Sequence, residues 1–257
     1  MVAGDETLQA IRDAARLIAG AEYVTCLTGA GVSVESNIRP FRGPGGLWTE
    51  KGEPPMDGYQ RFLRDPKRYW ENRLSRGGDF GISLRDAEPN PGHYALAELE
   101  KMGVLRCIIT QNIDNLHLAA GSREVLEIHG NSSYLRCMDC MERWPRGEFN
   151  VDSLPPRCPE CGGVVKGDTV MFGEPIPQGV LQRCFEEAQS SDCMIVAGTS
   201  ATVTPAASLP VLVKRRGGVL IEVNILPSDI SSICDVNIYG PSGEALPALI
   251  EEVKKLR

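Results

Sequence analysis

The sequence predicts an α/β protein with a largely parallel, doubly wound sheet into which one further module is inserted. Two observations support this prediction. Short apolar segments that are typical of buried strands alternate with amphipathic segments of helical period along most of the chain. The block from Asn131 to Asp168 breaks the alternation, because it is polar, rich in Cys, Pro and Gly, and has no long periodic segment. We therefore expect an inserted module there.

The composition is that of a globular protein. The chain has 257 residues, 42% hydrophobic and 24% charged, which suits one large domain with insertions or two domains. A formal net charge of −7 argues against stable nucleic-acid binding and favours a basic peptide partner. No apolar run reaches the roughly 18 residues that span a bilayer, and the first residues lack a signal-peptide pattern. We therefore expect a cytoplasmic monomer without membrane contact.

The beginning of the chain predicts a helix, a strand and a glycine turn. Glu6 to Ala19 has an apolar stripe of helical period, and Tyr23 to Leu27 is a run of β-branched and apolar residues. The turn Thr28-Gly29-Ala30-Gly31 leads into a short helix, whose first N–H groups we expect to be unpaired and to bind a pyrophosphate. Val34 stands at the third glycine of the dinucleotide fingerprint, so this turn alone does not separate a nucleotide site from an ordinary tight turn.

The loop from Ser36 to Trp48 has the composition of a lid. It carries Arg39, Phe41 and Arg42, followed by a run of glycine and proline. A lid over a ligand needs flexible hinges and large side chains that exclude water, whereas a linker lacks clustered arginine and aromatic residues.

The rest of the chain alternates between strands and helices, so the sheet should be largely parallel. Strands are predicted at Leu105–Thr110, Val125–His129, Cys193–Ala197, Gly218–Val223 and Asp235–Tyr239. Helices are predicted in two pieces between Asp57 and Leu74, from a cap at Asn90 to Lys101, and at Ile113–Ala120, Gln178–Gln189, Pro205–Arg216 and Glu244–Leu256.

Four of the nine cysteines have the spacing of a structural zinc site. Cys137 and Cys140 form one Cys-x2-Cys pair, Cys158 and Cys161 form another, and seventeen residues separate the pairs. Four thiolates complete a tetrahedral zinc site and leave no position for a reactive water, so such a site holds structure. Two redox pairs or four unrelated thiols are the alternatives. The other cysteines are predicted to be buried core residues: Cys26, Cys107, Cys184, Cys193 and Cys234.

His129 is the best placed of the three histidines for catalysis. It follows the apolar segment Val125 to Ile128, which puts its imidazole at the carboxyl end of a strand, where α/β folds bind ligands. His93 and His117 lie in predicted helices, where we expect capping or buried hydrogen-bonding roles.

Polar side chains also follow three other predicted strands. They are Thr110, Gln111, Asn112 and Asp114 at the end of the first, Thr199 and Ser200 of the segment Gly198-Thr199-Ser200 after the second, and Asn224 after the third. With the glycine turn, these strand ends converge on one crevice at the carboxyl edge of the sheet. The convergence predicts a ligand site without identifying its reaction.

The ordered motifs resemble those of the sirtuin family of NAD-dependent protein lysine deacylases. They are GAGVS, PFRGPGGLW, TQNIDNLH, HG, the two Cys-x2-Cys pairs, VMFGE, AGTS and VN, and they match over roughly residues 20 to 245. The resemblance implies a Rossmann-like NAD-binding domain with a smaller domain made of a zinc ribbon and a helical insertion. The implied bounds are 1–35, 89–130 and 170–257 for the large domain, 36–88 for the cofactor-binding loop and helical module, and 131–169 for the zinc-ribbon module.

The resemblance also implies an activity. In sirtuins the acyl-lysine carbonyl oxygen attacks C1′ of the nicotinamide ribose, nicotinamide leaves, and a ribose hydroxyl resolves the imidate to O-acyl-ADP-ribose. NAD would be a consumed co-substrate, acyl-lysine peptides or proteins the partners, and one zinc ion structural. The alternatives are an NAD-dependent mono-ADP-ribosyltransferase, a hydride-transfer dehydrogenase and a regulatory zinc-ribbon binding module. A dehydrogenase normally has an acidic ribose-binding residue where this chain has its arginine-rich loop.

Site residues follow from the same resemblance. His129 would be the base for the ribose hydroxyl, Asn112 a second catalytic residue, and Phe41 a shield that keeps water from C1′. Gln111, Asn112 and Asp114 would hold the nicotinamide ribose and carboxamide. The other cofactor-binding residues would be Gly29, Ala30, Gly31, Ser33, Arg42, Trp48, Ile113, Gly198, Thr199, Ser200, Asn224, Ile225, Leu226 and Ser242. The substrate peptide would pair as an added strand with Val170, Met171, Phe172, Gly173 and Glu174.

Two segments depart from the family pattern. The stretch Ser36-Asn37-Ile38-Arg39-Pro40 replaces a small Gly-Ile-Pro stretch, which leaves details of the cofactor loop open. Arg73 and Arg76 lie where members that remove succinyl or malonyl groups carry a Tyr-x-x-Arg pair. As i, i+3 neighbours on a helix, they could bind the carboxylate of such an acyl chain, or they could be solvated surface arginines. The preference among acetyl, succinyl or malonyl, and long-chain acyl groups stays open.

Overall fold

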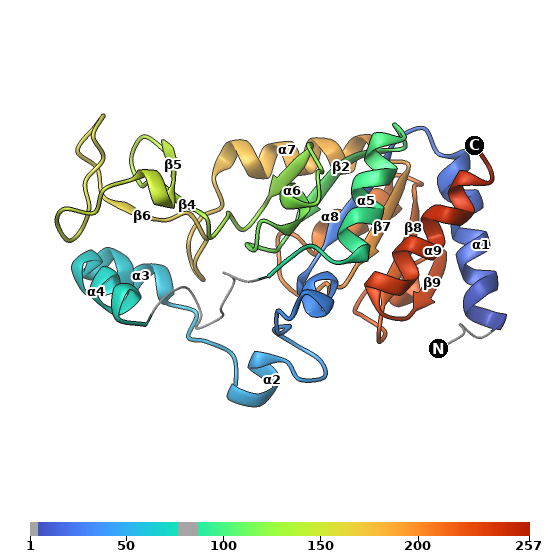
Figure 1. Cartoon of the computed structure of the whole chain (residues 1–257), viewed down its shortest axis with the longest axis horizontal. Helices are drawn as coiled ribbons and strands as arrows, with labels where there is room; N and C mark the ends of the chain where they lie inside the picture. The colour runs from blue at the N-terminus through green and yellow to red at the C-terminus, as the bar shows by residue number, and fades with distance from the viewer. Residues whose placement is uncertain (1–4, 77–86) are drawn as a thin grey trace.

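The computed structural model describes residues 5–76 and 87–257. A six-stranded parallel sheet forms the centre of the larger part of the molecule (Figure 1). Its strands are β1 (Val24–Thr28), β2 (Leu105–Thr110), β3 (Val125–Glu127), β7 (Cys193–Ala197), β8 (Val219–Asn224) and β9 (Val236–Tyr239). Their spatial order is β3-β2-β1-β7-β8-β9, so the winding reverses between β1 and β7. The predicted doubly wound parallel sheet is confirmed, and its reversal is where such sheets bind ligands.

Helices cover both faces of this sheet because alternate strand residues point to opposite sides. Cys26 of β1 packs in one buried cluster, and the next residue, Leu27, packs in the other. The helices on the first face are α1 (Asp5–Gly20), α5 (Pro91–Lys101) and α9 (Ser242–Lys254), and those on the second are α7 (Gln178–Ser190) and α8 (Ser208–Arg215). The six strands and the amphipathic helices that flank them therefore form two apolar layers, one on each face of the sheet.

A second, smaller sheet lies at the other end of the molecule (Figure 1). It is antiparallel, in the order β5-β4-β6, and is built from β4 (Tyr134–Cys137), β5 (Arg143–Pro145) and β6 (Val165–Gly167). Two helices, α3 (Gly58–Arg64) and α4 (Pro66–Arg76), lie beside it. Trp70 of α4 is 2% exposed and donates its indole N–H to the carbonyl of Val165 at 2.8 Å. The inserted module is confirmed, and it shares a small core with the helical piece.

Several element boundaries differ from the sequence predictions, and two of them affect the site. The helix expected at Ile113–Ala120 is only α6 (Leu116–Ala119), because Asn115 has φ 69° and the Asp114 carboxylate accepts the N–H of Leu116. The strand expected to reach His129 ends at Glu127. By contrast, Asn90 caps α5 as expected, accepting the Gly92 N–H at 2.9 Å. The remaining short elements are η1 (Ala30–Ser36), α2 (Leu47–Lys51), η2 (Arg146–Glu148) and η3 (Ser231–Ile233).

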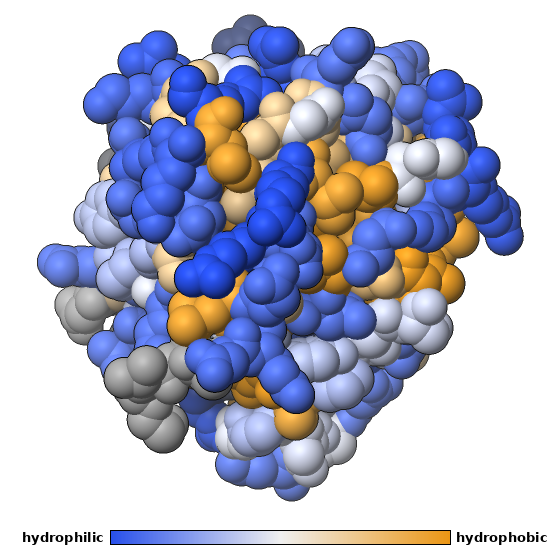
Figure 2. All heavy atoms as spheres, turned by 90° about the vertical axis from the view of Figure 1, so that its right-hand side faces the viewer, coloured by the Kyte–Doolittle hydropathy of each residue, from blue (hydrophilic) through white to orange (hydrophobic). Residues whose placement is uncertain are grey.

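The end of the molecule that carries α1 and α9 has a mixed surface. Figure 2 shows hydrophobic side chains there, set among hydrophilic ones. Exposed apolar residues such as Leu8 on α1 and Leu256 after α9 are part of the described surface. None of the described helices is both long and apolar enough to cross a bilayer.

Candidate active site

A cavity of about 920 Å³ opens where the winding of the large sheet reverses. Its walls come from the turn after β1, from the loops after β2, β7 and β8, from the lid loop, and from the segment that follows β6. The lining includes all of the predicted cofactor and substrate residues whose side chains the structure describes, except Ser33, Asp114 and Arg73. Residues that are separated by up to more than two hundred positions in the sequence therefore line one cavity.

The glycine turn packs directly against the loop after β7. Gly31 donates its N–H to the Gly198 carbonyl at 2.7 Å, and Gly29 donates its N–H to Ala197 at 3.0 Å. A Cβ on Gly31 would lie 2.6 Å from the Cα of Gly198, so only glycine allows this approach. The expectation that the first N–H groups would be unpaired is therefore wrong for these two residues. The turn continues into η1, a 3-10 helix rather than an α-helix.

Amides and hydroxyls at neighbouring strand ends are linked across the cavity wall. Gln111 donates from Nε2 to Thr199 Oγ1 at 2.9 Å, and Asn224 donates from Nδ2 to the Thr199 carbonyl at 2.9 Å. Asn112 donates from Nδ2 to the Gly29 carbonyl at 3.0 Å. The polar strand ends that the sequence analysis grouped together are therefore in contact, and they fix the carboxyl edge of the sheet.

Ser33 and Asp114 lie behind this wall. Ser33 Oγ donates to Asp114 at 2.7 Å and accepts from Asn112 Nδ2 at 3.1 Å. Both residues therefore orient Asn112 in the described structure. His93 accepts the N–H of Asn90, and the Nε2 of His117 bonds Thr28 Oγ1 at 2.9 Å. The expected capping and buried hydrogen-bonding roles of His93 and His117 are confirmed.

His129 is held in one tautomer by its neighbour. Its Nδ1 lies 3.2 Å from the carbonyl oxygen of Gln111, and because a carbonyl only accepts, Nδ1 carries the proton. Nε2 is then left with its lone pair, and the residue lines the cavity. Burial lowers the pKa of His129 below its ordinary range, and the hydrogen bond to Gln111 opposes this only in part. The imidazole is therefore neutral near pH 7 and can accept a proton.

Two aromatic rings of the lid loop pack against each other and against Phe172, which lies in the segment from Val170 to Glu174. The ring centroids of Phe41 and Trp48 are 4.6 Å apart, and those of Trp48 and Phe172 are 5.6 Å apart. The Arg42 guanidinium lies 4.7 Å from the centre of the Trp48 ring and donates to Glu53 at 2.6 Å. The lid thus covers the cavity with an aromatic layer, and its arginine is paired with a carboxylate.

Sequence reasoning missed several lining residues. Ile176, Leu181 and Val203 supply apolar wall, and their sequence context is that of ordinary core positions. Glu35 also lines the cavity and accepts the N–H of Gly243 at 2.5 Å, which joins η1 to the first turn of α9. Glu35 follows closely after the GAGVS motif, which is the only feature of the sequence that could have indicated it. A single glutamate in such a turn is typical of a solvated residue.

Arg73 lies away from the cavity, in the contact between α4 and β6. It is 7% exposed, and its Nη1 donates to Tyr69 Oη at 3.0 Å. A Cβ on Gly167 would lie 2.9 Å from the Arg73 Cζ, so the missing side chain of this glycine makes room for the guanidinium. Arg73 is therefore buried rather than solvated, and it is not among the residues that line the cavity, while its predicted contact with a substrate acyl group stays a prediction. The side chain of Arg76 lies outside the described residues.

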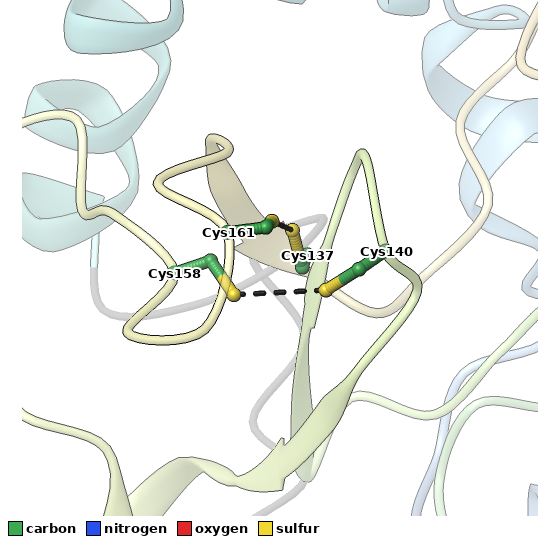
Figure 3. Close-up of side chains that lie close together, drawn as sticks. All are labelled: Cys137, Cys140, Cys158 and Cys161. Carbon is green, nitrogen blue, oxygen red and sulfur yellow. Dashed lines mark hydrogen bonds between the residues drawn. The ribbon is translucent and has the colours of Figure 1, made fainter.

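The four cysteines of the two Cys-x2-Cys pairs meet at one point (Figure 3). Their sulfur atoms all lie within 4.8 Å of one another, with Cys137 and Cys161 3.5 Å apart and Cys140 and Cys158 3.6 Å apart. Four sulfurs at about 2.3 Å from a zinc ion are separated by about 3.8 Å, so the arrangement fits zinc. None of the four lines the cavity. The donor set therefore fits a structural zinc rather than a catalytic one.

Residues 29–205 match the sequence profile of the Sir2 family. NAD-dependent protein deacylase 2 of Archaeoglobus fulgidus is 45% identical over 254 residues, which cover 96% of this chain and 97% of the relative. The NAD-dependent protein deacylase of Thermococcus kodakarensis is 45% identical over 249 residues, which cover 95% of each.

Solved structures resemble the chain over nearly its whole length. A Sir2 homologue in complex with NAD is 40% identical, with a TM-score of 0.79 over 95% of this chain and 94% of the homologue. Sir2Af2 bound to a myristoylated histone peptide is 42% identical, with a TM-score of 0.71 over 97% of this chain and 98% of that protein.

Proposed function

Because this chain belongs to the Sir2 family, we propose that it is an NAD-dependent protein deacylase that removes acyl groups from protein lysines. The proposal includes the release of nicotinamide and O-acyl-ADP-ribose. Relatives that match 95% or more of the chain carry this activity in their names, and the Sir2 homologue solved with NAD shares the fold of this chain.

One observation supports the proposal most directly. A single cavity joins a nucleotide-type wall, made by the glycine turn and the polar strand ends, to the segment from Val170 to Glu174. His129 lies between the two, and it supplies the one imidazole among the described lining residues. A dehydrogenase has no need of a peptide-binding segment beside its nucleotide, and a regulatory module has no need of a positioned base.

The residues present suit a reaction in which NAD is the co-substrate. When NAD is bound, the ribose carbon that carries nicotinamide is the electrophile for the acyl-lysine carbonyl oxygen. His129 accepts a proton from a ribose hydroxyl at Nε2, since its Nδ1–H is held by Gln111. Asn112 is fixed by Gly29 and Ser33 and orients the ribose. Phe41, stacked on Trp48, excludes water from the reacting face.

The acyl-lysine substrate binds as an extended peptide along the segment after β6. That segment lines the cavity and belongs to no described strand, so it can accept an added one. The likeness to Sir2Af2, which has been solved with a myristoylated histone peptide, supports acylated peptides as substrates.

Nicotinamide release that depends on an acylated peptide tests the proposal. We would incubate the protein with NAD and an acetyl-lysine peptide, with the unmodified peptide as control, and analyse the products by mass spectrometry. Equal amounts of nicotinamide, deacetylated peptide and O-acetyl-ADP-ribose are expected, and none with the control. A peptide that gains ADP-ribose and keeps its acetyl group would instead identify an ADP-ribosyltransferase. Formation of NADH would identify a dehydrogenase, and NAD binding without turnover a regulatory module.

A further inference from the structure

The Glu174 carboxylate is buried where the segment from Val170 to Glu174, called the substrate segment below, meets strands β4 and β6 of the zinc ribbon. The side chain is 2% exposed, and Oε1 accepts from Arg136 Nη2 at 2.7 Å. Oε2 lies 3.0 Å from Lys166 Nζ and accepts the backbone N–H of Met171 at 2.9 Å. One carboxylate thus ties β4, β6 and the substrate segment together.

The two cations belong to the strands of the ribbon. Arg136 precedes the cysteine Cys137, and its side chain is 4% exposed. Lys166 has no exposed side-chain surface, and besides Glu174 it donates to the carbonyls of Gly167 and Thr169. The two cations belong to a wider network: Asp168 also pairs with Arg136 and with Arg143, whose side chain is 41% exposed, and Arg143 pairs in turn with Glu127.

The substrate segment needs such support because it cannot have hydrogen-bonded strands on both sides, as an inner strand of a sheet does. A peptide that pairs along it requires one open edge. On its other side the segment has single backbone bonds, from the Val170 N–H to the His129 carbonyl at 2.8 Å and from the Tyr59 N–H to the Phe172 carbonyl at 3.1 Å. Glu174 adds the bond to Met171 and closes the turn at Gly173, where φ is +80°. The carboxylate therefore fixes the segment from behind.

Buried ion pairs are a poor means of gaining stability, because removing charges from water costs about as much as their attraction returns. Apolar side chains of similar volume would hold the ribbon at least as well. Arg136, Lys166 and Glu174 instead add directional hydrogen bonds, which hold the Glu174 carboxylate in one orientation. Accurate placement of reacting groups matters greatly to rate, and a displacement of about 1 Å can cost about a hundredfold.

We propose that Glu174, held by Arg136 and Lys166, is a positioning residue that sets the substrate segment for the acyl-lysine peptide and, through the Val170 to His129 bond, the catalytic imidazole. This inference rests on the proposed deacylase function of the same site. It gives the zinc ribbon a role in substrate binding although none of its cysteines reaches the cavity.

The test uses Glu174→Gln, which keeps the size of the side chain but removes its charge and turns an NH₂ group toward a cation. Binding of a fluorescein-labelled acetyl-lysine peptide is measured by anisotropy with ADP-ribose present, alongside peptide KM, kcat, NAD affinity and zinc content. We expect peptide Kd and KM to rise by about tenfold or more and kcat to fall, while NAD affinity changes less than about twofold and the zinc stays bound. The matched control is Lys214→Met, which breaks the 2.7 Å ion pair to Asp235 at the far edge of the large sheet and should leave peptide binding unchanged.

Lys166→Met provides a second route if Glu174→Gln does not fold, because it removes a cation and keeps a linear apolar chain. It should raise the peptide Kd in the same way, and the double variant should be no worse than the poorer single variant. Peptide binding equal to wild type in the folded variant, or equal losses of peptide and NAD binding, would overturn the positioning role. A wild-type protein that binds the acetylated peptide without deacylating it would overturn the proposed function and leave the positioning role intact.

Discussion

The Nδ1 atom of His129 and the carbonyl oxygen of Gln111 are 3.2 Å apart, and this one bond decides which imidazole nitrogen carries the proton. It also joins two strand ends, since Gln111 follows β2 and His129 follows β3. The strand pair therefore carries the proposed base and its orienting group together. Two predictions follow from this geometry.

Replacing the base should stop the reaction without unfolding the protein. We expect His129→Ala to lower deacylation by about a hundredfold or more, the usual contribution of a positioned base, because no other imidazole lines the described cavity. The melting temperature should stay within a few degrees of wild type, since His129 is only partly buried. Steady-state rates and a thermal melt measure both effects. A folded variant with near-normal turnover would show that another group is the base.

The pH profile should report the lowered pKa of His129. The base works when neutral, so kcat/KM falls as pH drops through its pKa, and burial places that pKa below the ordinary value of about 6.5. We therefore expect the acid limb of kcat/KM to have its midpoint below pH 6.5. A midpoint above pH 7, or the same limb in the residual activity of His129→Ala, would contradict the assignment.

The sequence predicted the large sheet well because its central strands consist mostly of apolar and β-branched residues. β1 and β7 are buried at every residue, and short runs of this kind that end at a glycine are typical of the inner strands of a parallel sheet. The domain bounds at residues 36, 89, 131 and 170, the cytoplasmic location and the monomeric state stay predictions. The Gly31 to Gly198 contact could not be predicted, because it depends on how two turns far apart in the chain approach each other.

Buried charges were the main feature that the sequence did not reveal. Arg136 and Lys166 alternate with apolar residues in short strands, a pattern that predicts outward-facing, solvated side chains. They are buried because the ribbon packs against the chain that follows β6, where the carboxylates of Asp168 and Glu174 pair with them. Arg73 is buried for a similar tertiary reason, the absence of a side chain at Gly167.

Uncharged acyl groups should be better substrates than succinyl groups. Arg42 is the only lysine or arginine among the described lining residues, and it already pairs with Glu53 at 2.6 Å. The wall near the substrate segment is apolar, with Met171, Ile176 and Leu181. A buried carboxylate without a partner is costly, so kcat/KM should be at least about tenfold lower for a succinyl peptide than for its acetyl or myristoyl form. Equal or higher efficiency on the succinyl peptide would point to a cation outside the described residues.

Removal of one zinc ligand should release the metal and loosen the ribbon. Cys137→Ser should lower the zinc content from about one ion per chain and reduce the melting temperature, because metal binding contributes directly to folding of such modules. Elemental analysis and thermal melts measure both effects. Cys234→Ser is the matched control. Because Cys234 lies outside the cluster, this variant should keep its zinc. A stable Cys137→Ser protein without zinc would rule out a structural metal.

Acid should destabilise the protein in part through His117. Thr28 Oγ1 donates to Thr110 and so accepts from His117 Nε2, while Nδ1 of His117 has no partner among the described residues. Burial, with a smaller effect from His93, lowers the pKa of His117 to about 3.

The unfolded chain therefore takes up this proton near pH 6.5, and the native state does not until pH is about 3. Stability is full above about pH 6.5 and is lost as pH falls toward 3, by up to a few kcal/mol at about 1.4 kcal/mol per pKa unit. His117→Gln keeps a donor for Thr28 but does not titrate. Urea unfolding at pH 7 and pH 4.5 should show a smaller loss for the variant than for wild type, with the same carboxylate contribution in both. An equal loss in the two proteins would show that His117 is already protonated in the native state.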